Sequence, residues 1–137
     1  MRKVTRQDRQ PIAVLIGLEA STLAIMSVLH LTRILAGGTR PFNRDHAGIA
    51  EAAICAVLIG GAAALSRDPL RGRAIARGTV GFAILGVIAG LNFTIQGGDA
   101  IDVTYHATLL PLLLVTLAAL WRGAPARTQA PPAPSRT

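Results

Sequence analysis

The sequence is poor in charged residues, in cysteine and in aromatic residues. Only 15% of its 137 residues are charged, against about 25% in a typical soluble domain, whereas 51% are hydrophobic. This balance excludes an ordinary soluble globule, a disordered chain and a coiled coil. The single cysteine, Cys55, excludes a disulfide framework and a cysteine-based zinc cluster. The class that remains is a small membrane protein with several spans.

Four long apolar runs account for most of the chain, and they cover residues 11–32, 47–65, 78–95 and 103–121. Each run is long enough to cross a bilayer core about 30 Å thick at a rise of about 1.5 Å per residue. None of them alternates with a period of two, which favours helices over membrane strands. The sequence therefore predicts an all-α integral membrane four-helix bundle over residues 11–121.

The distribution of lysine and arginine predicts the orientation of this bundle. Four of these residues lie in segment 1–10, four between the second and third runs, and three in segment 122–137, whereas the other side of the bundle receives three. Basic residues concentrate on the cytoplasmic side of membrane proteins. We therefore predict that the N and C termini are both cytoplasmic.

The two ends of the chain differ in composition from the apolar runs. Segment 1–10 is predicted to be a basic cytoplasmic N-terminus. Segment 122–137 is rich in proline, alanine, threonine and arginine and is predicted to be a disordered cytoplasmic tail. The abundance of arginine and alanine indicates a bacterial source, so the predicted location is the cell (plasma or inner) membrane.

The net charge of +7 follows largely from this predicted topology. No folded basic domain presents the charge, so we expect no nucleic-acid partner. The expected partners are the lipid bilayer and either a second copy of the chain or another subunit of a membrane complex.

The predicted topology brings most of the polar side chains of the runs to one level. Six polar residues, contributed by all four helices, are predicted to fall in the external third of the bilayer: His30, His46, Glu51, Asn92, Asp102 and His106. Ionisable groups are costly in lipid, so we expect them to face the bundle interior or a wet cavity. The sequence thus predicts an outward-facing polar pocket.

The residue types in this pocket point to a metal ion. Imidazole and carboxylate groups are ligands of zinc, copper and iron, which makes His30, Glu51 and His106 the predicted ligands, with His46 as a fourth candidate. Asn92 and Asp102 are predicted to support those ligands through hydrogen bonds. Two histidines on opposed helices would alternatively ligate a haem. In the simplest alternative, the histidines only hydrogen-bond to neighbours or lipid headgroups at the membrane surface.

Glu19 is a lone carboxylate near the middle of the first run. Such a group is suited to exchanging protons for a substrate in a proton-coupled carrier. The segment GLEASTLAIMS resembles the first span of the small multidrug resistance transporters, which are similar in helix number and in carrying such a glutamate. The sequence departs from that family because its first three runs lack Trp and Tyr and its connections are longer. We therefore do not assign it to the family. A structural role, with Glu19 bonded to Ser21, Thr22 or a facing helix, is the alternative.

Three functions follow from these patterns: an accessory or ligand-binding membrane module with a His/Glu pocket, a proton-coupled transporter that uses Glu19, and a structural subunit of a membrane complex. The sequence contains neither a glycine-rich phosphate loop nor a nucleophile elbow, so no motif of these kinds indicates an enzyme. Asp45 and Asp102 precede the second and fourth runs and are predicted to be helix N-caps.

Overall fold

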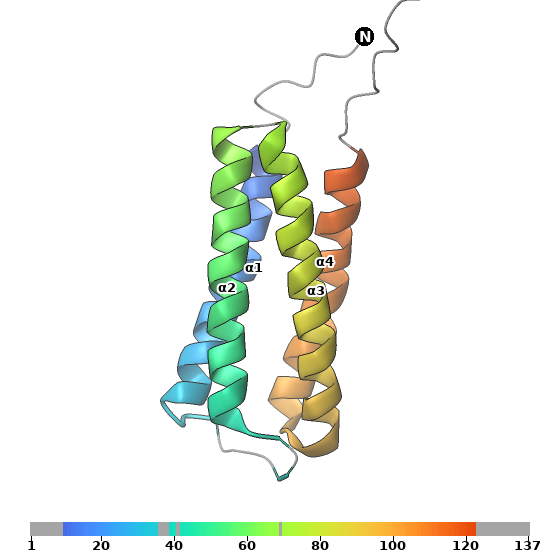
Figure 1. The fold of residues 1–137 in the computed structure, drawn as a ribbon. Coiled ribbons are helices and arrows are strands. Elements are labelled where there is room, and N and C mark those ends of the chain that lie inside the picture. The colour runs from blue at the N-terminus through green and yellow to red at the C-terminus, as the bar shows by residue number, and fades with distance from the viewer. Residues whose placement is uncertain (1–9, 36–38, 41, 69, 123–137) are drawn as a thin grey trace, which may run out of the picture.

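The computed structural model describes residues 10–35, 39–40, 42–68 and 70–122. These residues form four helices: α1 (Gln10–Leu31), α2 (Arg44–Arg67), α3 (Arg71–Gly97) and α4 (Ala100–Arg122). No strand occurs in these ranges. The predicted all-α four-helix bundle is therefore confirmed (Figure 1). The predicted terminal segments lie outside the described residues, except for Gln10 and Arg122.

Most of the helices extend beyond the apolar runs because polar residues cap them. The Asn43 side chain accepts hydrogen bonds from the backbone N–H groups of Asp45 and His46, so α2 begins at Arg44. Asp99 Oδ1 accepts from the N–H groups of Ile101 and Asp102, at 2.8 and 3.0 Å. The prediction that Asp45 and Asp102 are the N-caps was therefore wrong, because an Asn or Asp shortly before each of them already binds the free N–H groups.

The helices are long and apolar enough to cross a membrane, each with a mean hydropathy of 1.8 or more over a stretch of 18 residues. Their outward faces carry large apolar side chains, and examples on all four helices are more than half exposed: Leu18, Ile59, Leu85 and Val115. An exterior with so many exposed apolar side chains suits lipid better than water. Length and composition thus indicate a multi-pass membrane protein.

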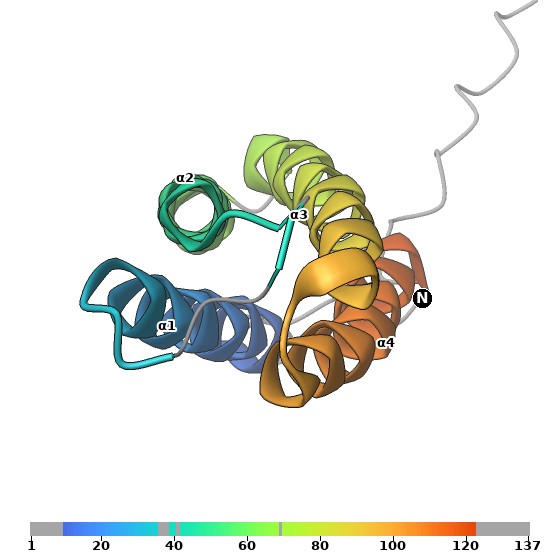
Figure 2. The same ribbon diagram turned by 90° about the horizontal axis from the view of Figure 1, so that it is seen from below.

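Each helix packs mainly against its neighbours in the sequence, and α1 and α4 share a smaller contact (Figure 2). Glycines allow close approach of α2 and α3: a Cβ at Gly61 would overlap the Thr79 side chain, and one at Gly72 would overlap the Ala64 carbonyl. The core is formed by buried aliphatic residues of all four helices, including Leu23, Leu58, Val80 and Leu113.

The contact between α1 and α4 includes three polar side-chain pairs, spaced along its length. His30 meets Asp102, Thr22 Oγ1 lies 3.2 Å from the Tyr105 hydroxyl, and Thr116 donates to Glu19. Lipid tails are as apolar as the side chains on the helices, so two helices gain no hydrophobic free energy by leaving lipid to contact each other. Hydrogen bonds and close packing hold them together instead. The α1–α4 contact therefore combines limited packing with directional polar bonds.

The two ends of the bundle differ in their connections. The α1–α2 and α3–α4 connections lie at one end, and the α2–α3 connection lies at the other end together with the start of α1 and the end of α4 (Figure 1). At this second end, Arg77 donates to the Leu120 carbonyl at 3.0 Å and lies 4.2 Å over the Trp121 ring. The buried histidines His30 and His106 and the carboxylates Glu51 and Asp102 gather at the first end.

Candidate metal centre

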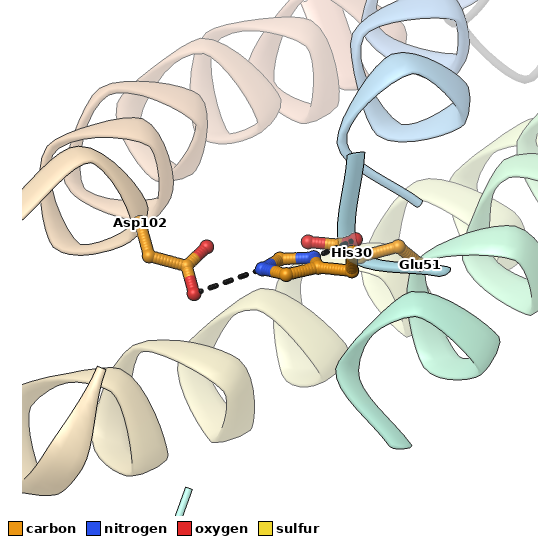
Figure 3. Close-up of side chains that lie close together, drawn as sticks. All are labelled: His30, Glu51 and Asp102. Carbon is orange, nitrogen blue, oxygen red and sulfur yellow. Dashed lines mark hydrogen bonds and ion pairs between the residues drawn. The ribbon is translucent and has the colours of Figure 1, made fainter. Parts of the chain in front are cut away.

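The centre of the polar site is the imidazole of His30, in the last turn of α1. Its Nδ1 lies 2.8 Å from Glu51 Oε2 and its Nε2 lies 3.1 Å from Asp102 Oδ2. Figure 3 shows the ring between a carboxylate from α2 and one from α4. None of the three residues is more than 3% exposed. Groups from three helices therefore form one buried cluster, called here the His30 centre (His30, Glu51 and Asp102).

Local packing between α1 and α2 places His30 against Glu51. Ser27 Oγ donates to the Gly48 carbonyl at 2.7 Å and joins the two helices one turn from the centre. Gly48 packs under the end of α1, since a Cβ there would lie 3.1 Å from His30 Cβ and 2.8 Å from Leu31 Cγ. Glu51 is three residues beyond Gly48 and so falls on the same face of α2.

Asp102 joins the centre from the first turn of α4. Because Asp99 already binds the free N–H groups at the start of this helix, the carboxylate of Asp102 is not needed as a cap. Its Oδ2 faces His30, while its Oδ1 lies 3.7 Å from His106 Nδ1, too far for a hydrogen bond. The sequence placed Asp102 in a supporting role, and the structure puts its carboxylate in direct contact with His30.

Two carboxylate oxygens of the centre lack a hydrogen-bond partner among the described residues. Glu51 Oε1 and Asp102 Oδ1 are buried and accept no hydrogen bond from the described residues. A buried polar atom without a partner typically costs about 1–3 kcal/mol, and more if it is charged. Such atoms are uncommon in folded proteins and call for an explanation, for example an ion that they bind.

The hydrogen-bond stoichiometry indicates that the His30 centre holds an additional cation or additional protons. A neutral imidazole carries one N–H and can donate to only one carboxylate, yet both ring nitrogens of His30 face one. With a neutral imidazole and two carboxylates the buried centre would carry a charge of −2. Burying net charge is expensive. Two protons or one divalent cation would make the centre neutral.

The three side chains are also close enough to share one ion. One possible ligand atom from each of them lies within 4.8 Å of the others. Ligands at about 2.0–2.2 Å from a common ion are at most about 4.4 Å apart. Three ligands of one ion lie on average at most about 3.8 Å apart, so the separations would have to shrink by up to about 1 Å to bring all three onto it.

His106 lies beside this centre. Its Nδ1 is 2.9 Å from the Asp102 backbone carbonyl, which can only accept, so Nδ1 carries a hydrogen. Its Nε2 makes no hydrogen bond within the described residues and packs against Gly90, where a Cβ would lie 2.7 Å away. A histidine held through Nδ1 with Nε2 left available has the orientation of a typical metal ligand. Here, however, the ring of His106 borders a cavity that lies between α2 and α3.

The other predicted site residues lie farther out. His46 is exposed in the first turn of α2, at the rim of the same cavity. Asn92 is on the exposed face of α3, and its Oδ1 accepts from Gln96 Nε2 at 2.6 Å. The structure therefore brings together His30, Glu51 and Asp102, places His106 next to them, and leaves His46 and Asn92 outside the cluster.

Glu19 forms a separate buried site. It lies eleven residues before His30, or about 16 Å along the helix. Thr116 Oγ1 donates to its Oε1 at 2.6 Å, and its Oε2 has no partner among the described residues. Thr22 donates to the Glu19 backbone carbonyl and not to its carboxylate. Of the partners expected from the sequence, a facing helix thus supplies the side-chain bond.

A cavity of about 390 Å³ lies between α2 and α3 next to the His30 centre. Its walls are mostly apolar, and Glu51, Thr94 and His106 contribute the buried polar groups. Glu51 therefore belongs to both features, with Oε2 on His30 and its side chain on the cavity wall.

No protein family, no curated protein and no solved structure matches this chain. Its function must therefore be inferred from the site itself.

Proposed function

We propose that this chain is a multi-pass protein of the cell (plasma or inner) membrane that binds one divalent transition-metal ion at the His30 centre. The observation that carries the proposal is the placement of His30 between two buried carboxylates, each with an unpartnered oxygen. The ion would neutralise the two carboxylates and bind at least one oxygen of each. With both termini cytoplasmic, as the arginine distribution favours, the centre lies near the external face.

The donor set favours particular metals. One imidazole and two carboxylates suit Zn²⁺, Fe²⁺ or Mn²⁺, whereas Cu⁺ prefers thiolate and thioether sulfur. Both ring nitrogens of His30 already face carboxylates, which fits a bare ion better than a haem. A metal-binding module is the more specific form of the accessory role that the sequence predicts.

The experiment is elemental analysis of protein purified in mild detergent, followed by titration with Co²⁺ as a spectroscopic probe. We expect about one metal per chain and visible Co²⁺ bands, because imidazole and carboxylate ligands suit Co²⁺ as well as Zn²⁺. His30→Gln and Asp102→Asn should each lower the metal content by about tenfold or more at a fixed free-metal concentration. His46→Gln is the matched control, because His46 is exposed and outside the cluster.

A wild-type protein that contains no metal and takes up none of Co²⁺, Zn²⁺, Fe²⁺ or Mn²⁺ would disprove the proposal. So would His30→Gln and Asp102→Asn proteins with the metal content of the wild type. A loss that is equally large in His46→Gln would show that the metal is bound elsewhere.

A second function, proton-coupled transport through Glu19, is supported by one separate observation. The Glu19 carboxylate is 3% exposed and bonded through one oxygen only, so it lies where a carrier would bind and release a proton. In vesicles, Glu19→Gln should abolish the uptake of a transported substrate that a pH gradient drives in the wild type. Unchanged uptake in this variant would exclude the role.

A further inference from the structure

The cavity between α2 and α3 has a composition that differs from the rest of the bundle. All three phenylalanines of the chain, Phe42, Phe82 and Phe93, line it. Phe82 and Phe93 are about half exposed, at 49% and 52%, so the aromatic wall continues onto the outer surface of α3. The cavity is therefore accessible from the side of the bundle that faces lipid.

Small residues create the hollow between these rings. On α2 the wall is built from alanines spaced by three residues, and on α3 from glycine and alanine: Ala47, Ala50, Ala53, Gly86, Ala89 and Gly90. Gly86 accommodates the Ile54 side chain, which a Cβ at that position would meet at 2.5 Å. A volume of about 390 Å³ lies within the range of about 300–1,000 Å³ that is typical of small-molecule sites.

Two of the residues that line this cavity carry a hydrogen-bond acceptor that is not used within the described residues. Glu51 is 3% exposed, lines the cavity and has no partner for Oε1. His106 carries its hydrogen on Nδ1, which leaves Nε2 as an acceptor in the neutral ring. A ligand that satisfies both groups must therefore donate hydrogen bonds.

We propose that this cavity binds a membrane-dissolved hydroquinone. Its ring would pack among the phenylalanines, its hydroxyl groups would donate to Glu51 and His106, and its apolar tail would extend into lipid. The acyl chain of a lipid fits the apolar walls but leaves the Glu51 oxygen without a partner, which favours a donor over a simple hydrocarbon. Aromatic rings also gain from stacked or edge-to-face contact with other rings.

The inference does not rest on the proposed metal site, although Glu51 borders both. The metal centre needs His30 and Asp102, whereas the cavity needs the alanine and phenylalanine walls. Variants can therefore remove one function without the other.

The test measures binding of an alkylated hydroquinone to the detergent-purified full chain by equilibrium dialysis. The comparison ligand is the dimethyl ether of the same compound, which has the same shape but no O–H groups. We expect saturable binding of the hydroquinone and at least about tenfold weaker binding of the ether, because the ether leaves two buried acceptors without a donor.

Cavity-filling variants locate the site. Ala50→Phe and Ala53→Phe place a ring in the hollow, and both positions are exposed, so the core need not repack. Each should abolish hydroquinone binding and leave the metal content unchanged. Ala52→Phe is the matched control, because Ala52 is exposed on the same helix but outside the cavity lining. It should bind the hydroquinone as the wild type does.

Several results would overturn the inference. Equal binding of the hydroquinone and its ether would show a site for any hydrophobic molecule. Absence of binding, or binding that persists in both Ala50→Phe and Ala53→Phe, would show that the cavity is not the site. The Asp102→Asn protein should lose the metal but still bind hydroquinone. A failure of the metal proposal can therefore be distinguished from a failure of the hydroquinone proposal.

Discussion

Metal binding at the His30 centre should depend steeply on pH. Without metal, two protons are needed to neutralise Glu51 and Asp102 beside a neutral imidazole, and a divalent ion replaces both. His106 is left out of this count because its Nδ1 donates to the Asp102 backbone carbonyl and not to a carboxylate of the centre. We therefore expect metal binding to release about two protons.

The magnitude follows from this stoichiometry. Each released proton changes the apparent dissociation constant tenfold per pH unit, so two protons change it about 100-fold, or about 2.7 kcal/mol per unit. The sign is that binding tightens as pH rises. Asp102→Asn removes one carboxylate, so neutrality then needs one proton, and the slope should fall to about tenfold per unit.

The assay is Co²⁺ titration at several pH values, with proton release measured in weak buffer. His46→Gln serves as the control and should keep the slope of the wild type, because His46 is exposed at the cavity rim. An affinity that does not change with pH, or a slope that is the same in Asp102→Asn, would refute the charge argument even if metal binds.

Two further predictions concern the fold. Gly72→Ala should destabilise the protein by about 1–3 kcal/mol, because its Cβ would overlap the Ala64 backbone. Gly78→Ala has nothing within 4 Å of the new Cβ and should stabilise the protein by about 0.5–1 kcal/mol. Unfolding in a denaturing-detergent titration measures both changes in stability, and equal changes in the two variants would contradict the packing. Thr116→Val should cost about 1–3 kcal/mol in the same titration, because it removes the hydrogen bond to Glu19. Thr108→Val, which loses only a bond to its own helix, should cost less than about 0.5 kcal/mol, and a similar cost in both would show that the Thr116 bond contributes little.

The number of helices and the shared level of the polar residues could be predicted from the sequence. Long apolar runs identify spans directly, and alternate spans run in opposite directions, so His30, Glu51 and Asp102 had to lie near the same end. The helix ends were less predictable, because Asn43 and Asp99 bind the free N–H groups in place of Asp45 and Asp102.

The face that each residue occupies could not be predicted equally well. A helix in lipid is apolar on its outer side as well as in the core, so hydrophobic periodicity says little about which side faces inward. Asn92 therefore looked as suitable as Asp102, yet it lies on the exposed face of α3. The direct contact of Asp102 with His30 depends on the Asp99 cap and on the rotation of α4, which only the packed structure shows.

The polar pairs between α1 and α4 have a consequence for how the protein is made. A membrane protein is inserted from its N-terminus, so α1 and α2 enter the bilayer with His30 and Glu51 before the last helix has been synthesised. Asp102 arrives with α4, and the same helix brings Tyr105 and Thr116 to their partners on α1. We expect that a nascent chain gains the ability to retain metal only when its fourth helix docks, so that metal retention reports completed assembly.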